Sequence, residues 1–175
     1  MFIKKFLALN TKKHLKNNKT KRNPSGFQEA KHIGIIFTIE DLEKHKAVKA
    51  FKKELEETGK EVDVIAYLEK GKENHEFLFD FITAQEVSIW GVIKNKHAIA
   101  FAQANFDYLF HIDKKRNDIL ENIVARSQAK CRIGIHNNDN SDFYELIIHQ
   151  DTDKSEENII SELHFYAQKI TGHEK

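Results

Sequence analysis

The chain has 175 residues, of which 40% are hydrophobic and 31% charged, and its formal net charge is +1. A chain of this length can bury a sizeable core without covalent staples, and its single cysteine excludes a disulfide framework and any metal site built from several cysteines. We find no run of roughly 20 apolar residues that could span a membrane and no secretion signal, so we expect a single-domain cytoplasmic protein.

The N-terminal arm, residues 1–23, differs sharply in charge from the rest of the chain. It holds eight of the 28 Lys and Arg and none of the 27 Asp and Glu, so the remainder carries 20 basic and 27 acidic residues. Wound as a helix, residues 2–16 present an apolar stripe about 160° wide at 100° per residue, with lysines opposite it or on its flanks. The stripe consists of Phe2, Ile3, Phe6, Leu7 and Leu9. We therefore predict a basic amphipathic helix, followed by a polar, unstructured stretch.

The only proline of the chain marks the end of this arm. It stands in the sequence NPSG (Asn23–Gly26), and proline and glycine so close together interrupt regular structure. We therefore predict three parts: a basic arm (1–23), a linker (24–31) and an α/β domain (32–175).

Beyond the linker, short apolar runs alternate with segments of helical periodicity. The apolar runs predict strands over residues 32–38, 61–68, 86–93, 108–113, 131–136 and 143–150. The periodic segments predict helices over residues 41–59, 74–82, 97–104, 116–129 and 155–170. This alternation is typical of a Rossmann-like three-layer α/β sandwich with a mostly parallel sheet. About six residues separate the last two strands, too few for a crossover helix, so we expect an antiparallel hairpin at one edge.

Ligands of open α/β sheets bind at the carboxyl ends of the strands, where we look first for chemistry. The first strand runs into TIED (Thr38–Asp41), which has two carboxylates and lacks the glycines of a phosphate-binding turn. We expect Thr38 or Asp41 to cap the next helix. Cys131 begins a strand, where a thiol is usually a small core residue.

Three further polar residues end neighbouring strands. His111 and Asp113 end the fourth predicted strand and His136 ends the fifth. Two imidazoles and a carboxylate can hold Fe(II) or Zn, or serve as an acid–base pair. In the structural alternative, His111 packs between sheet and helix, Asp113 caps the following helix, and His136 starts a turn. We favour that alternative and predict neither a metal nor a cofactor, while an enzymatic role stays open.

The segment FDYLFHIDKKRNDILENIVARSQAKCRIGI (Phe106–Ile135) resembles the amino-terminal Rossmann-like half of family-9 glycosyltransferases of the heptosyltransferase type. The matching residues are Phe106, Asp107 and Tyr108 at one strand and Arg132, Ile133 and Gly134 at the next. This resemblance implies a fold. Such enzymes bind the sugar nucleotide mainly through a second Rossmann domain, for which these residues leave no room. As a whole, the chain also resembles a group of uncharacterised small α/β proteins from Bacteroidota, a domain of unknown function, which implies no activity.

The basic arm has three interpretations. Its lysines could neutralise phosphates of RNA or a ribosome, it could lie on an anionic membrane surface with its stripe inserted, or the stripe could pack on its own domain or on a second copy. We expect a non-enzymatic accessory protein that docks through the arm, with RNA or a ribonucleoprotein as its first partner and a membrane surface as the alternative. The enzymatic alternative is a reduced glycosyltransferase-like or metal-dependent enzyme. The side chains expected to contact the anionic partner are Lys4, Lys5, Lys12, Lys13, Lys16, Lys19, Lys21 and Arg22.

Overall fold

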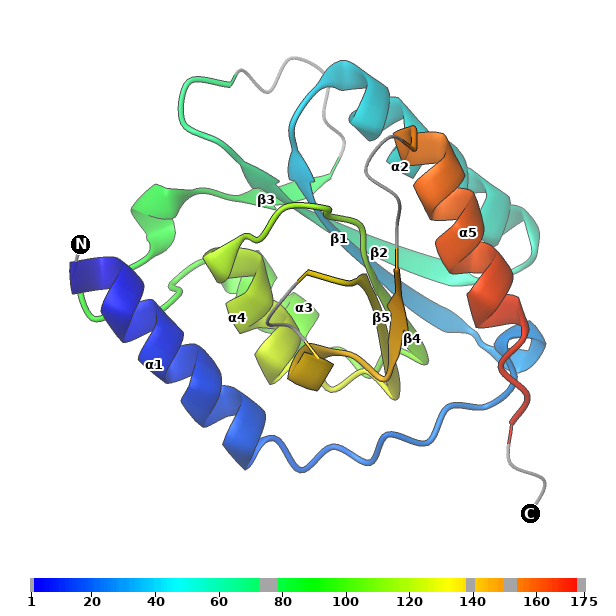
Figure 1. The fold of residues 1–175 in the computed structure, drawn as a ribbon, viewed down its shortest axis with the longest axis horizontal. Helices are drawn as coiled ribbons and strands as arrows, with labels where there is room; N and C mark the ends of the chain where they lie inside the picture. The colour runs from blue at the N-terminus through cyan, green and yellow to red at the C-terminus, as the bar shows by residue number, and fades with distance from the viewer. Residues whose placement is uncertain (1, 73–78, 138–140, 150–153, 173–175) are drawn as a thin grey trace.

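A computed structural model describes residues 2–72, 79–137, 141–149 and 154–172. These residues form a Rossmann-like three-layer sandwich around a six-stranded sheet in which every pair of neighbouring strands is parallel (Figure 1). The strand order is β3-β2-β1-β4-β5-β6. The strands are β1 (His32–Ile39), β2 (Glu61–Leu68), β3 (Asp80–Ile82), β4 (Tyr108–His111), β5 (Cys131–Ile135) and β6 (Leu146–Ile148).

Helices cover both faces of this sheet, as the burial of parallel strands requires. Their bounds are α1 (Phe2–Asn17), α2 (Leu42–Glu57), α3 (Lys96–Gln103), α4 (Asp118–Arg126) and α5 (Glu156–Gln168). One apolar cluster joins α2 and α5 to the sheet, and a second joins α3 and α4 to the opposite face. The helix α1 packs on the outer side of α4 rather than on the sheet (Figure 1).

The first predicted strand and the helix that follows it are confirmed as β1 and α2. Seven of the eight residues of β1 are buried, which explains why the sequence there is a continuous apolar run. Asp41 caps α2 by accepting a hydrogen bond from the backbone N–H of Lys44. Gly59 follows the helix with a φ of +82°, the left-handed conformation expected after a helix end.

The expected antiparallel hairpin at the sheet edge is wrong. The strand β6 pairs parallel to β5, with Gly134 opposite Ile147. The connection can be short because β6 has only three residues and η3 (Ser141–Phe143), a single 3-10 turn, takes the place of a crossover helix. Tyr144 packs directly over Gly134, where a β-carbon would lie 2.5 Å from the tyrosine ring. The missing side chain at Gly134 therefore makes room for a compact parallel return.

Two other predicted elements differ from the structure. Part of the helix expected over 74–82 lies outside the described residues, and its last part is the edge strand β3. The strand expected over 86–93 does not form. It is replaced by a 3-10 turn, η2 (Ala84–Glu86), and by a tight hairpin turn over Ser88–Val92, which we call the Trp90 loop. The apolar run misleads because Ile89, Trp90 and Val92 are exposed in this loop.

The arm is folded against the domain. The side chains of Leu7 and Thr11 are buried, and Asn122 of α4 donates a hydrogen bond to the hydroxyl of Thr11 (2.9 Å). After α1, the chain runs extended along the sandwich, and Phe27 enters the core against Tyr108. Part of the predicted linker is therefore packed core.

The arm and the domain also approach each other closely at Gly91. This glycine has a φ of +68°, and a β-carbon there would lie 2.3 Å from the backbone nitrogen of Leu7. Asn10 fixes the same contact, because its amide donates to the carbonyls of Trp90 (2.9 Å) and Gly91 (3.0 Å). The docking of α1 therefore depends on a residue without a side chain at this point.

Replacing Gly91 with alanine should loosen α1. Gly59→Ala is the matched control, since Gly59 also has a positive φ but no atom within 4 Å of its added β-carbon. In both variants the left-handed conformation lowers the free energy of unfolding by about 1–2 kcal/mol. Only Gly91→Ala should additionally speed the amide hydrogen exchange of α1. Equal exchange rates in α1 of the two variants would show that the contact at Gly91 does not hold the helix.

Candidate functional site

The carboxyl ends of β1 and β4 form the topological switch point of the sheet, where ligands of doubly wound folds bind. The chain leaves β1 toward α2 on one face and leaves β4 toward α4 on the other. A crevice would open between these two connections. In this protein, side chains fill that space.

Asp113 is the centre of this filling and is 4% exposed. Its carboxylate accepts hydrogen bonds from the backbone N–H of Thr38 (2.8 Å) and from the hydroxyl of Thr38 (2.6 Å). The ammonium group of Lys44, itself 1% exposed, donates to the same carboxylate at 2.7 Å. The switch point is therefore closed by an ion pair between the start of α2 and the end of β4.

The charges of this cluster stabilise one another. Burial alone would raise the pKa of Asp113, but the neighbouring His111 and the charge of Lys44 lower it to about 2. Burial likewise opposes the charge of Lys44, yet Asp113 raises the pKa of that ammonium group. Both groups are thus ionised at neutral pH. The charge of each is balanced by the other, without a ligand.

The structure brings together only two of the three polar residues at the strand ends. The Nε2 atom of His111 lies 3.5 Å from a carboxylate oxygen of Asp113, and its Nδ1 atom lies 2.6 Å from the hydroxyl of Tyr144. His136 stacks on His149 instead, with ring centroids 4.2 Å apart. Across the described residues, no group of three or more His, Cys, Asp or Glu is arranged to hold a metal ion.

One further expectation about this part of the chain is wrong, and two are confirmed. Asp113 does not cap the following helix, because Asn117 does so by accepting from the backbone N–H groups of Ile119 and Leu120. Of the two expected caps of α2, Asp41 is the one that caps the helix, and the hydroxyl of Thr38 donates to Asp113 instead. Cys131 is buried, and burial together with Glu145 raises the pKa of its thiol to about 12. That thiol stays protonated and is a core residue.

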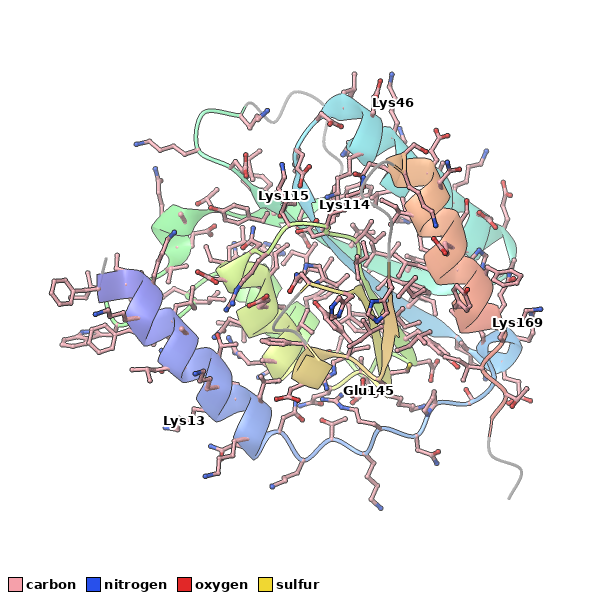
Figure 2. All side chains as sticks on the ribbon, viewed as in Figure 1. Lys13, Lys46, Lys114, Lys115, Glu145 and Lys169 are labelled. Atoms are coloured by element: carbon pink, nitrogen blue, oxygen red, sulfur yellow. The ribbon has the colours of Figure 1, made fainter. Side chains whose placement is uncertain are left out.

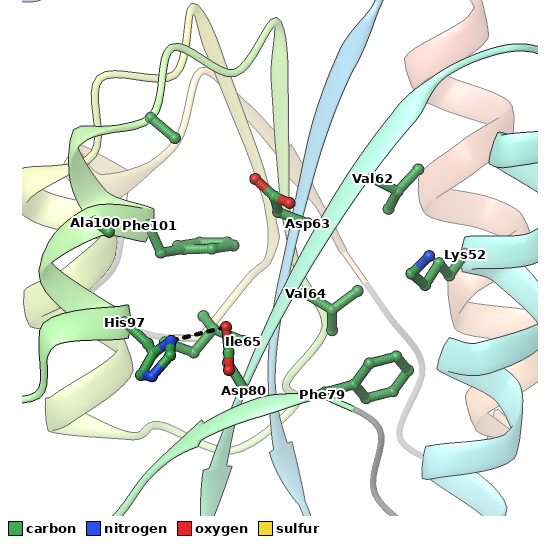
Figure 3. Close-up of a pocket in the computed structure, with 11 residues that line it drawn as sticks. Lys52, Val62, Asp63, Val64, Ile65, Phe79, Asp80, His97, Ala100 and Phe101 are labelled. Carbon is green, nitrogen blue, oxygen red and sulfur yellow. Dashed lines mark ion pairs between the residues drawn. The ribbon is translucent and has the colours of Figure 1, made fainter.

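A groove of about 380 Å³ lies beside the first half of β2, between α2 and α3 (Figure 3). Its floor is Val62–Ile65, and Lys52 and Phe101 stand on opposite walls. At its lower end in this view, His97 forms an ion pair with Asp80 at 3.0 Å. Both side chains of this pair are exposed, and none of the described residues lining the groove is a Ser, Thr, Cys or Tyr. The described lining of the groove therefore supplies no hydroxyl or thiol nucleophile for the His–Asp pair to activate.

The outer surface of α1 is different in character. The two buried side chains of α1 are Leu7 and Thr11. At 100° per residue, the middle of this buried side lies about 100° around the helix from the middle of the predicted apolar stripe. Only Leu7 of that stripe is buried. Leu7 and Leu15 pack on the apolar cluster of α3 and α4. Polar contacts add to this packing, since Asn18 of the segment after α1 donates to the carbonyls of Ala125 and Ser127 (both 2.9 Å). The helix does pack on its own domain, but it does so largely without its stripe.

The stripe therefore remains at the surface and is extended by the Trp90 loop. Phe2 is 75% exposed, Leu9 63% and Trp90 63%. The ring of Phe6 contacts that of Trp90 edge-on, with centroids 5.4 Å apart. We call the exposed set the apolar patch, and it consists of Phe2, Ile3, Leu9, Ile89, Trp90 and Val92.

The predicted basic residues divide into two groups. The seven lysines of the arm are exposed, and Lys13 lies at the outer edge of the molecule in Figure 2. Arg22 belongs to the domain instead: its guanidinium donates to the carbonyls of Ser127 (3.1 Å) and Ala129 and lies 3.6 Å from Glu145. Burial and the nearby charge of Arg132 lower the pKa of Arg22 to about 10. The surface available to an anionic partner is therefore made of lysines.

Sequence reasoning did not find Lys44 or the Trp90 loop. No local signal distinguishes Lys44 from the other lysines of α2, because its burial depends on Asp113, 69 positions away. The Trp90 loop did carry a signal. Gly91 interrupts the apolar run, and residues 87–106 contain no Asp or Glu at all.

Comparison with known proteins adds a family. The model of a family described as a family of unknown function (DUF6913) matches residues 4–170, which include α1 as well as the α/β domain. No curated protein matches the chain.

Replacing Lys44 with methionine should destabilise the protein by about 3–5 kcal/mol, because it leaves the charge of Asp113 buried without its partner. The double variant Lys44→Met, Asp113→Asn should recover part of that loss, since asparagine carries no charge. Urea denaturation of the two variants measures the difference. If the double variant is less stable than Lys44→Met by the full cost of a second independent substitution, the two groups are not coupled.

The low pKa of Asp113 also predicts an acid transition. Its stabilisation is complete above the ordinary value of 3.8 and is lost as the pH falls toward about 2, where the native carboxylate takes up a proton. The expected contribution is about 2 kcal/mol. The free energy of unfolding should therefore fall more steeply over this range in the unmodified protein than in Asp113→Asn. Parallel pH profiles would assign the acid sensitivity to other carboxylates.

Proposed function

The chain belongs to the family of unknown function DUF6913, and we propose that its member described here is a non-enzymatic accessory protein that docks through the outer face of α1 onto an anionic surface. The observation that carries this proposal is the way α1 is attached. The domain holds the helix by an inner side that combines Leu7 with the polar Thr11 and leaves all seven lysines of the arm exposed.

A rigidly mounted basic helix differs from a loose basic tail. Contacts at Thr11, Asn10 and Asn18 fix α1 on α4 and on the Trp90 loop, so its lysines are presented in one orientation. Little backbone freedom has to be lost by the helix when it docks, which favours affinity. The acidic remainder of the chain would repel an anionic surface and so disfavours other orientations.

The strand ends support a binding role rather than a catalytic one. The site where a doubly wound fold holds its ligand is occupied by the Lys44–Asp113 ion pair, which is buried and satisfied. The groove beside β2 supplies a His–Asp pair without a hydroxyl or thiol nucleophile among its described lining residues. None of the described helices has the length and apolar character needed to cross a bilayer, so attachment would be peripheral.

The lysines of the outer face should determine binding. We expect the quadruple variant with Lys5, Lys12, Lys13 and Lys16 changed to glutamine to lose association with an anionic surface. At about 1 kcal/mol for each lysine near an anionic lipid surface, four substitutions weaken binding about 1,000-fold at low salt.

The matched control removes four exposed lysines from other elements, with Lys46, Lys49, Lys115 and Lys169 changed to glutamine (Figure 2 labels three of them). Both variants have the same net charge. Each is sedimented with purified ribosomes and with vesicles containing phosphatidylglycerol, at low and at high salt. Equal loss of binding in the two variants, or no binding of the unmodified protein to either probe, would contradict docking through α1.

A further inference from the structure

The apolar patch narrows the choice of anionic surface. We propose that the N-terminal half of α1 and the Trp90 loop insert together into the headgroup region of an anionic lipid bilayer, while the lysines of α1 contact the lipid phosphates. This inference rests on the proposed docking through α1 and adds the chemical class of the partner.

The first argument is the exposure of large apolar side chains that the fold could have buried. Monomeric proteins rarely expose contiguous apolar patches larger than a few hundred Å², and such patches often mark binding sites. Here Phe2, Leu9 and Trp90 are each more than 60% exposed, although Leu7, between them in the sequence of α1, is 3% exposed. A phosphate-lined RNA surface would bury little of these aliphatic and aromatic side chains in apolar surroundings.

The second argument is that the patch comes from two segments far apart in the sequence. Phe6 contacts Trp90, and Asn10 donates hydrogen bonds to the backbone of the same loop. The hairpin bond from the backbone N–H of Ser88 to the carbonyl of Val92 (2.9 Å) holds the loop shape. The apolar groups are therefore displayed on a preformed support, which reduces the ordering cost of insertion.

The third argument is charge complementarity. The two segments that form the patch, residues 1–28 and 87–106, contain none of the 27 Asp and Glu of the chain. Exposed lysines flank the patch on both segments: Lys4 and Lys5 on α1, and Lys94 and Lys96 after the loop. Basic side chains around apolar and aromatic groups, with tryptophan at the boundary, are typical of peripheral membrane attachment.

Binding on one side of the bilayer also fits the geometry of α1. On the exposed side of the helix, Phe2 and Leu9 alternate with Lys5, Lys12 and Lys16. The apolar groups can enter the boundary of the acyl chains while the long lysine side chains reach outward to the phosphates. The Trp90 loop then adds a second apolar contact beside the helix, so attachment does not depend on the helix alone.

The protein contains a single tryptophan, Trp90, so its fluorescence reports directly on the patch. On mixing with vesicles of phosphatidylcholine and phosphatidylglycerol, we expect a blue shift of the emission and quenching by brominated acyl chains. Vesicles of pure phosphatidylcholine should give a much smaller response at the same lipid concentration, because the lysines then have no anionic partner.

The variant Phe2→Ser, Leu9→Ser keeps the reporter and all lysines but removes two exposed apolar groups. We expect its partition into anionic vesicles to fall at least tenfold. The matched control is Phe165→Ser, which removes an aromatic side chain that is 52% exposed on α5 and should bind as the unmodified protein does. All three residues are exposed, so folding should be preserved. Circular dichroism spectra of the variants check this.

Several outcomes would overturn insertion. If the protein binds anionic vesicles without a fluorescence shift or quenching, or if Phe2→Ser, Leu9→Ser binds normally, the lysines alone hold it at the surface and the docking proposal stands. Binding to ribosomes but not to vesicles would show that the lysines of α1 contact RNA and not a lipid surface. A blue shift that depends on protein concentration without lipid, together with a larger particle in size-exclusion chromatography, identifies the patch as a contact between two copies. Failure to bind any probe removes both proposals.

Discussion

The buried ion pair between Lys44 and Asp113 determines how the centre of this fold is used. It links the first turn of α2 to the end of β4, and Asp113 also binds both the backbone and the hydroxyl of Thr38 at the end of β1. Two central strands and one helix therefore meet at a single carboxylate. A buried charge without its partner is strongly destabilising, so this position cannot be vacated easily for a ligand.

The Lys44–Asp113 ion pair lies where a doubly wound sheet usually binds its ligand. A doubly wound sheet normally has its ligand crevice where successive connections leave toward opposite faces. In this protein the same place is a structural joint, and the exposed features lie elsewhere. The groove beside β2 is lined by a solvated His–Asp pair, and the α1 side has exposed lysines next to exposed aromatic and aliphatic groups. Of these, only the α1 side combines charge, apolar surface and a rigid support.

The attachment of α1 explains why that surface exists. A typical surface helix buries its apolar stripe and exposes its polar face. Here Leu7 is the one stripe residue buried against the domain, Thr11, Asn10 and Asn18 add hydrogen bonds, and the centre of the stripe is turned away from α4. Gly91 lets the Trp90 loop approach the backbone of α1 at Leu7, so a second apolar segment joins the first. Polar anchoring on one side thus leaves apolar groups available on another.

The sequence by itself was sufficient for the fold class, for most of the elements and for the amphipathic basic helix. Local periodicity reports these features, because a strand buried on both faces, such as β1, reads as a continuous apolar run. The same reasoning failed for residues 86–93, where an apolar run is an exposed loop, and for β6, where loop length alone suggested a hairpin. In both cases a close contact at a glycine decided the outcome: Gly91 with Leu7 of α1, and Gly134 with Tyr144 across the short connection to β6.

The tertiary structure alone decided where the candidate residues lie and which groups they contact. It assigned Arg22 to the domain, separated His136 from His111, and paired Asp113 with a lysine 69 positions earlier. It also set the orientation of α1, which the helical periodicity leaves free, and placed the single tryptophan beside the basic arm. The physical reason is the same throughout: local periodicity shows which residues share a face, whereas the partner of that face depends on contacts between segments distant in the chain.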